Sequence, residues 1–203
     1  MRTRVVVGFI LVFTLVVAGQ AFAQNVEGGI KGGVNFSTVS GDFGIGVSKT
    51  NRISGVGGAF GTFLLTDRVG VQIEALYSME GSKATVATLG TNVESTVQID
   101  YIRIPLLLRL GARPGVQRSG YFLVGPALGF IAAAKQTFPG RADQDLKDQL
   151  KSSEFAVVVG AGMTFSHYLF EIRYTAGLTD INNQSSSGTN KSQTFSVMGG
   201  IRF

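Results

Sequence analysis

The two side chains best suited to nucleophilic chemistry lie next to each other, at Ser166-His167. A serine and a histidine suggest a hydrolase, in which a carboxylate such as Glu154 or Glu171 would orient the imidazole. However, this dipeptide forms a short turn between two apolar stretches, and adjacent residues in a turn do not form a catalytic triad. His167 is the only histidine and the chain has no cysteine, so a structural metal site is also disfavoured. We therefore expect no enzymatic activity, no metal site and no cofactor.

A second group of notable side chains is charged and lies within segments that alternate between apolar and polar residues. In residues 98–110, Arg103 and Arg109 share one face, and isoleucines and leucines occupy the other. Because one arginine facing lipid near the midplane costs about 2–4 kcal/mol, we place both arginines inside. Charges of both signs can pair across a narrow lumen, whereas an unpaired buried charge is costly. The predicted interior polar network consists of Glu74, Arg103, Arg109, Glu171, Arg173 and Arg202.

The elements that must position these charges have a period of two, which is typical of strands with two different faces. Eight such segments lie at about residues 27–39, 53–65, 69–80, 98–110, 121–134, 154–165, 168–179 and 193–203. Their connections alternate in length, and the long ones are 40–52, 81–94, 135–153 and 180–192. Outer-membrane barrels have long loops outside the cell and short periplasmic turns. An even number of strands then leaves both termini in the periplasm.

Three places leave the pattern ambiguous. The second segment is rich in glycine, and we expect its larger side chains to face outward, namely Val56, Phe60 and Leu64, with Gly57, Ala59 and Gly61 inward. Asp100 has the parity of the lipid-facing residues, which predicts a bulge near Tyr101 or a position above the membrane. Residues 143–151 are compatible both with a short helix across the barrel mouth and with a solvated loop.

The last segment has an apolar face that ends on the final residue of the chain. Phe195, Val197, Ile201 and Phe203 alternate with mostly polar or small residues. A strand with a terminal aromatic residue suits the closure of a transmembrane barrel, in which no open edge is tolerated. This pattern also resembles the signal that the bacterial outer-membrane assembly machinery reads. An ordinary last strand of a soluble sheet is the alternative.

The N-terminus has the features of a secretory signal peptide. Two arginines precede an apolar run at residues 5–18, and Ala21 and Ala23 form a cleavage motif before Gln24. The run has 14 residues, fewer than the roughly 20 that a membrane-spanning helix needs. We therefore expect residues 1–23 to be a signal peptide and residues 24–203 to form one barrel domain. The small positive charge is spread along the chain, which disfavours nucleic-acid binding.

Four motifs occur in order along the mature chain, and together they resemble a known family. They are EALYSMEG at 74–81, DYIRIPLLL at 100–108, GPALG at 125–129 and EIRYTAGLTDI at 171–181. The most specific is the stretch from tyrosine to three leucines. The chain resembles the PorT-like outer-membrane β-barrel family of Bacteroidetes-type bacteria. This resemblance implies an eight-stranded barrel, and it offers no catalytic or metal motif.

The sequence therefore predicts an all-β protein, an eight-stranded antiparallel up-and-down transmembrane β-barrel in the bacterial outer membrane. Three functional classes remain: a structural or interaction barrel that displays four loops, a ligand-binding or passive transport barrel, and a lipid-acting enzyme. Eight strands enclose a lumen that holds only side chains or one small ligand, which disfavours a diffusion pore. We favour the first class, as a monomer in contact with lipid. A soluble ligand-binding barrel is the alternative if the chain does not insert.

Overall fold

The computed structural model describes residues 26–40, 47–88, 91–111, 118–137, 144–145, 153–179 and 191–203. Their strands are β1 (Val26–Ser40), β2 (Val47–Thr66), β3 (Val69–Thr88), β4 (Thr91–Leu110), β5 (Arg118–Thr137), β6 (Gln144–Asp145), β7 (Ser153–Phe165), β8 (Tyr168–Gly177) and β9 (Lys191–Arg202). Among these residues, no helix has the length and apolar character needed to cross a membrane.

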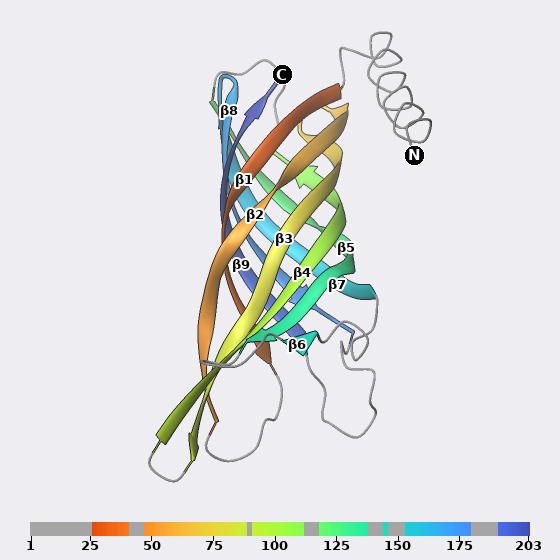
Figure 1. The fold of residues 1–203 in the computed structure, drawn as a ribbon. Coiled ribbons are helices and arrows are strands. Elements are labelled where there is room, and N and C mark those ends of the chain that lie inside the picture. The colour runs from red at the N-terminus through yellow and green to blue at the C-terminus, as the bar shows by residue number, and fades with distance from the viewer. Residues whose placement is uncertain are drawn as a thin grey trace, which may run out of the picture.

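The strands form one closed antiparallel barrel. Their order is β4-β3-β2-β1-β9-β8-β7-β5-β6, and β4 also pairs with β5, which joins the two ends of the sheet. In the described part of the chain, β6 pairs only with two residues near the end of β5, so eight strands make the wall. The first residues of β1 and the last residues of β9 lie at the same rim of the barrel (Figure 1). The predicted eight-stranded up-and-down barrel is confirmed.

The faces of the wall follow the alternation in the sequence. On β5, Tyr121, Leu123 and Ala127 are buried, whereas Phe122 and Phe130 are exposed. The exposed face of this strand therefore begins and ends on an aromatic ring, with aliphatic residues between them. Exposed aromatic rings also lie toward both ends of the outward faces at Tyr168 and Tyr174 on β8 and at Phe195 and Phe203 along and just beyond β9. Aromatic residues at both ends of an apolar band are typical of barrels that span a membrane.

β9 and β1 close the barrel along twelve paired positions. The backbone of Phe203 exchanges two hydrogen bonds with that of Gly28, at N–O distances of 2.9 and 3.3 Å, so the ladder extends to the last residue. Phe195, Ile201 and Phe203 are exposed on the outer face, and Val197 is half-buried on β9 between them. The Phe195 ring lies 6.3 Å from that of Phe36 on β1, centroid to centroid.

The predicted facing of β2 is wrong. Phe60 and Leu64 are buried, and Val56 lines an interior cavity. The outer face carries Gly57, Ala59 and Gly61 together with exposed larger residues such as Phe63. The interior needs the volume of these side chains, and the Phe60 ring lies 5.3 Å below the Lys31 ammonium group. The prediction placed the three residues outward because their side chains are larger than those of their neighbours. The polar Thr62, which is buried and has the same parity as Phe60, carries the correct signal.

Two of the predicted long loops are mostly strand. β3 continues to Thr88 and β4 begins at Thr91, so the expected loop at 81–94 is a hairpin that projects past the rim (Figure 1). β2 likewise begins at Val47, within the expected loop at 40–52. Polar or small residues occur at both parities of the hairpin, so the sequence there lacks a clear period of two. Gln144–Asp145 forms a strand, which rules out a helix over these residues, whereas 146–152 lie outside the described residues.

The bulge predicted near Tyr101 is confirmed. The β4–β5 register shifts between Asp100 and Tyr101, which pair with Ala133 and Ile131. Asp100 keeps the parity of the outer residues and accepts a hydrogen bond of 2.9 Å from the Tyr77 hydroxyl. The amide of Gln98 donates a second hydrogen bond to the same carboxylate, at 3.2 Å. The acid is thereby satisfied at the end of the apolar band that lies away from the termini.

Candidate functional site

Charged side chains fill the lumen in three clusters along the barrel axis. The central cluster consists of Lys31 on β1, Glu74 on β3, and Glu171 and Arg173 on β8. The Lys31 ammonium lies 2.8 Å from Glu74 and 3.2 Å from Glu171. Arg173 donates to Glu74 at 2.8 Å and also contacts Glu171. Two cations and two carboxylates therefore neutralise one another, and each side chain is at most 3% exposed.

Tyr121 packs beside the central cluster and supports it. Its hydroxyl donates to Glu171 at 3.2 Å. The opposite position on β7 is Gly162, and a Cβ atom there would lie 2.4 Å from the Tyr121 ring. Only glycine leaves room for this ring. The Arg109 guanidinium on β4 lies 4.0 Å from the centre of the same ring. Tyr121 thus connects the central cluster with the charges nearer the termini.

The loop-side cluster lies toward the rim opposite the termini and consists of Glu80 on β3, Arg103 on β4 and Glu154 on β7. Arg103 donates two hydrogen bonds to Glu80, at 2.6 and 2.8 Å, and one to Glu154 at 2.8 Å. One cation thus faces two carboxylates. Hydroxyl groups supply the remaining donors: those of Ser78 and Thr194 donate to Glu80, and that of Ser192 donates to Glu154.

The terminal-side cluster lies at the rim where β1 begins and β9 ends (Figure 1). Glu27 accepts from Arg202 at 2.9 Å and from Arg109 at 3.3 Å. Two cations here face one carboxylate, the reverse of the loop-side cluster. Across the three clusters, five cations therefore match five carboxylates. The three clusters together are neutral, with two cations per carboxylate at the rim near Glu27 and two carboxylates per cation around Arg103.

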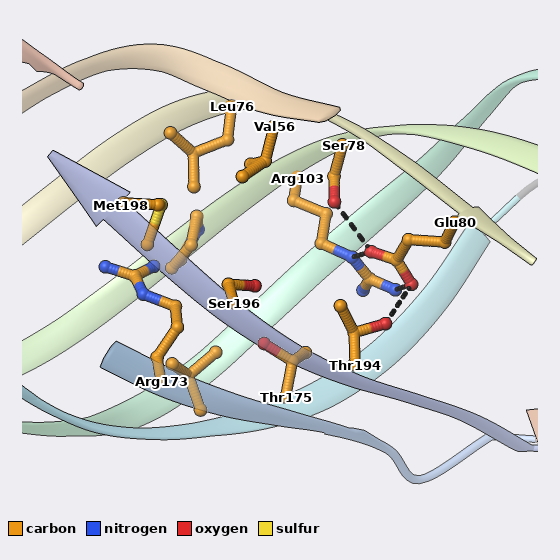
Figure 2. A pocket seen from close by; sticks show the side chains of 12 residues that line it. Val56, Leu76, Ser78, Glu80, Arg103, Arg173, Thr175, Thr194, Ser196 and Met198 are labelled. Atoms are coloured by element: carbon orange, nitrogen blue, oxygen red, sulfur yellow. Dashed lines mark hydrogen bonds and ion pairs between the residues drawn. The ribbon is translucent and has the colours of Figure 1, made fainter. Parts of the chain in front are cut away.

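A small cavity separates the central and loop-side clusters (Figure 2). Its volume is about 10 Å³, which is room for about one water molecule. Arg173 lines one side, the Arg103–Glu80 pair lines the other, and Thr175 and Ser196 point between them (Figure 2). Leu76 and Met198 also line the cavity (Figure 2), so its wall is mixed, and its volume is too small for an organic ligand.

The six residues of the predicted network all lie in these clusters. Glu74, Glu171 and Arg173 meet in the central cluster, whereas Arg103 belongs to the loop-side cluster. Arg109 and Arg202 meet through Glu27, at the rim. Four partners were not predicted, namely Glu27, Lys31, Glu80 and Glu154. Glu80 shares the parity of Glu74, and Lys31 that of the polar residues of β1, so the same alternation could have identified both.

Ser166 and His167 form an exposed turn at the terminal-side rim. The Ser166 hydroxyl lies 3.1 Å from Nδ1 of His167. Glu154 and Glu171 are buried in the lumen and contact cations there, so neither is available to orient this imidazole. Among the described residues, no group of three or more His, Asp or Glu side chains is placed to hold a metal ion. The cleavage motif at Ala21, Ala23 and Gln24 lies outside the described residues.

Comparison with known proteins identifies one family. A family model described as "Outer membrane protein beta-barrel domain" matches residues 22–183. No curated protein matches the chain. Similar crystal structures include Ail, the attachment invasion locus protein of Yersinia pestis, at 16% identity over 88% of this chain and 99% of that one, with a TM-score of 0.46.

Two further solved structures show a similar degree of likeness. OprG from Pseudomonas aeruginosa is 18% identical over 88% of this chain and 96% of its own, with a TM-score of 0.46. Neisserial surface protein A is 8% identical over 87% and 97%, with a TM-score of 0.47. These values are too low to transfer a role to this chain, so the family match carries the identification.

Proposed function

This chain belongs to the outer membrane protein β-barrel domain family, and on that premise we propose that it is a closed barrel that does not conduct and acts through its exposed rim. It is a small eight-stranded barrel of the bacterial outer membrane. In the proposed role, the wall anchors the chain in lipid and the long connections face the outside of the cell. The role is structural or one of interaction with other molecules.

The observation that carries this proposal is the neutral packing of the lumen. Ten charged side chains span the interior from β1 to β9, and the cavity between the clusters has a volume of only about 10 Å³. An ion crossing this lumen would have to separate several buried ion pairs, and a charge left without its partner in such a place is costly. A passive transport role would instead require an open path. Between the clusters, the described residues likewise leave a cavity too small for an organic ligand.

Planar lipid bilayers provide the test. We expect the refolded full chain to insert without giving stable single-channel currents, while a general porin in the same bilayer conducts. The variant Glu80→Ala/Arg103→Ala removes two of the side chains that obstruct the lumen, and it should give small, defined currents if it inserts. A stable unit current from the unmodified chain would refute the closed barrel and favour passive transport.

Several finer features belong to the same proposal. Residues 1–23 are removed as a signal peptide, and the last strand directs insertion by the barrel assembly machinery. The four motifs support a place among the PorT-like members of the family. The mature barrel is a monomer without enzymatic activity and without affinity for nucleic acids. Gel mobility of outer-membrane extracts, boiled against unboiled, tests the folded barrel in its native membrane, because folded barrels migrate differently until heated.

A further inference from the structure

The projecting part of the sheet has two lateral edges. Among the described residues, β2 pairs with β1 only as far as Arg52, opposite Ser37, and Val47–Asn51 pairs with β3 alone. β4 pairs with β5 only from Thr96, opposite Thr137. Residues 91–95, named here the β4 edge, therefore pair with β3 alone among the described residues. Three strands thus continue beyond the rim without the rest of the barrel (Figure 1).

The backbone direction at the β4 edge follows from the hairpin. Thr88 pairs with Thr91 across a two-residue connection, and such a closing pair exchanges both of its backbone hydrogen bonds. The odd residues of β4 therefore direct their N–H and C=O groups to β3, and the even residues direct theirs away. Pro105 supports this parity, because the β3–β4 ladder is interrupted at this residue, which has no N–H to donate. Asn92 and Glu94 consequently present their backbone groups at the open edge.

The two edges differ in the features that prevent pairing with an additional strand. Native proteins protect open edges with lysine, proline or bulges. The β2 edge contains Lys49, and its register with β3 is irregular between Asn51 and Val56. The β4 edge reads Thr-Asn-Val-Glu-Ser, without lysine, arginine or proline, and its register with β3 has no shift. The β4 edge is therefore the one that can accept another strand.

We infer that the β4 edge binds an extended segment of a separate polypeptide, which adds a strand in the place where β5 ends. This inference rests on the proposed function, because it requires the rim to face the outside of the cell. Such strand addition gives affinity through backbone hydrogen bonds. Because the edge sequence contains one acidic and no basic residue, the segment is of neutral or positive charge and rich in strand-forming residues.

A second copy of the chain is a poorer occupant of this edge. Copies that insert into one membrane have the same orientation, so their β4 edges run in the same direction and can meet only in parallel. Parallel pairing is slightly less stable per residue than antiparallel pairing. A free polypeptide has no such restriction and can pair antiparallel with residues 91–95. The edge therefore fits a partner that is not itself anchored in the same membrane.

The experiment uses the full mature chain in nanodiscs and a phage-displayed library of twelve-residue peptides as the probe. Peptides selected on the unmodified protein are measured against Asn92→Pro/Glu94→Pro, which removes two outward N–H groups and leaves those paired with β3. The matched control, Asn92→Thr/Glu94→Thr, keeps every N–H. We expect at least a tenfold loss of affinity in the proline variant, less than a threefold change in the control, and slower amide exchange at Asn92 and Glu94 with peptide.

Three outcomes would overturn the inference. The first is a selection that yields no peptide, and the second is a set of selected peptides that bind the proline variant as well as the unmodified chain. The third is protection of the Asn92 and Glu94 amides without peptide, which would show that the chain itself covers the edge or, if protection requires two copies per disc, that a second copy does. The bilayer currents are independent of this edge, so a failure here leaves the closed-barrel proposal standing, and stable currents would refute that proposal alone.

Discussion

The central and loop-side clusters bury their charged side chains to a similar extent, at 4% exposure or less, but balance the charges differently. In the central cluster, Lys31 and Arg173 each contact both Glu74 and Glu171, so every charge has two opposite neighbours. In the loop-side cluster, Arg103 alone serves Glu80 and Glu154, and hydroxyl groups complete the carboxylates. The comparison teaches that buried carboxylates can be satisfied in hydrogen bonds where their charges are not balanced, even though Nη1 of Arg103 has no hydrogen-bond partner among the described residues. Substitutions should distinguish these two conditions.

The largest effect is expected at Arg103, because it is the only cation of its cluster. Arg103→Met keeps much of the side-chain volume but leaves two buried carboxylates without a cation. Breaking a buried pair in this way costs about 3–5 kcal/mol in the free energy of unfolding. Urea titration in lipid vesicles, followed by gel mobility, measures it. Arg103→Lys is the control, since it retains the charge and should lose less. A loss below about 1 kcal/mol for Arg103→Met would show that the hydroxyl groups alone suffice.

A matched pair of neutral substitutions tests the charge balance directly. Glu171→Gln removes a carboxylate from a balanced cluster and leaves Lys31 and Arg173 with one partner, which should cost about 1–3 kcal/mol. Glu154→Gln removes the surplus carboxylate of the loop-side cluster while keeping an acceptor for Arg103 or Ser192. Removing the surplus buried charge is favourable and losing a charge-assisted hydrogen bond is unfavourable, so the two effects partly cancel. The net loss in the free energy of unfolding should therefore be under about 1 kcal/mol. The same unfolding assay compares them, and equal losses would refute the difference between the clusters.

The smallest effect is expected at the terminal-side rim. The Arg202–Glu27 pair lies at 2.9 Å with side chains that are 14% and 17% exposed, so solvent screens it more than the inner pairs. Arg109 also stays beside Glu27 when Arg202 is changed. Arg202→Gln should therefore cost about 0–1 kcal/mol. A loss comparable to that of Glu171→Gln would mean that water is excluded from this rim as well.

The alternation of the sequence was sufficient for most of the fold. It located eight strands, the closure on Phe203, the outward face of residues 102–110 and the bulge beside Asp100. It failed on β2, where glycines alternate with bulky residues and only Thr62 signals the inner face. It also failed at residues 81–94, where the hairpin projects past the rim and its two faces are no longer set by the wall and the lumen of the barrel. A period of two in the sequence requires that two different environments select the two faces of a strand.

The amino-acid sequence by itself determined which residues face inward on the clearly alternating strands, because parity along a strand is a local property. Only the tertiary structure decided which of these residues meet. Lys31 contacts Glu171, which is 140 positions away, and Arg103 contacts Glu80 and Glu154 across the lumen. Such contacts depend on the stagger and tilt of all eight strands around the closed barrel. The registers that set them, together with the extension of β2, β3 and β4 past the rim, result from the pairing of whole strands.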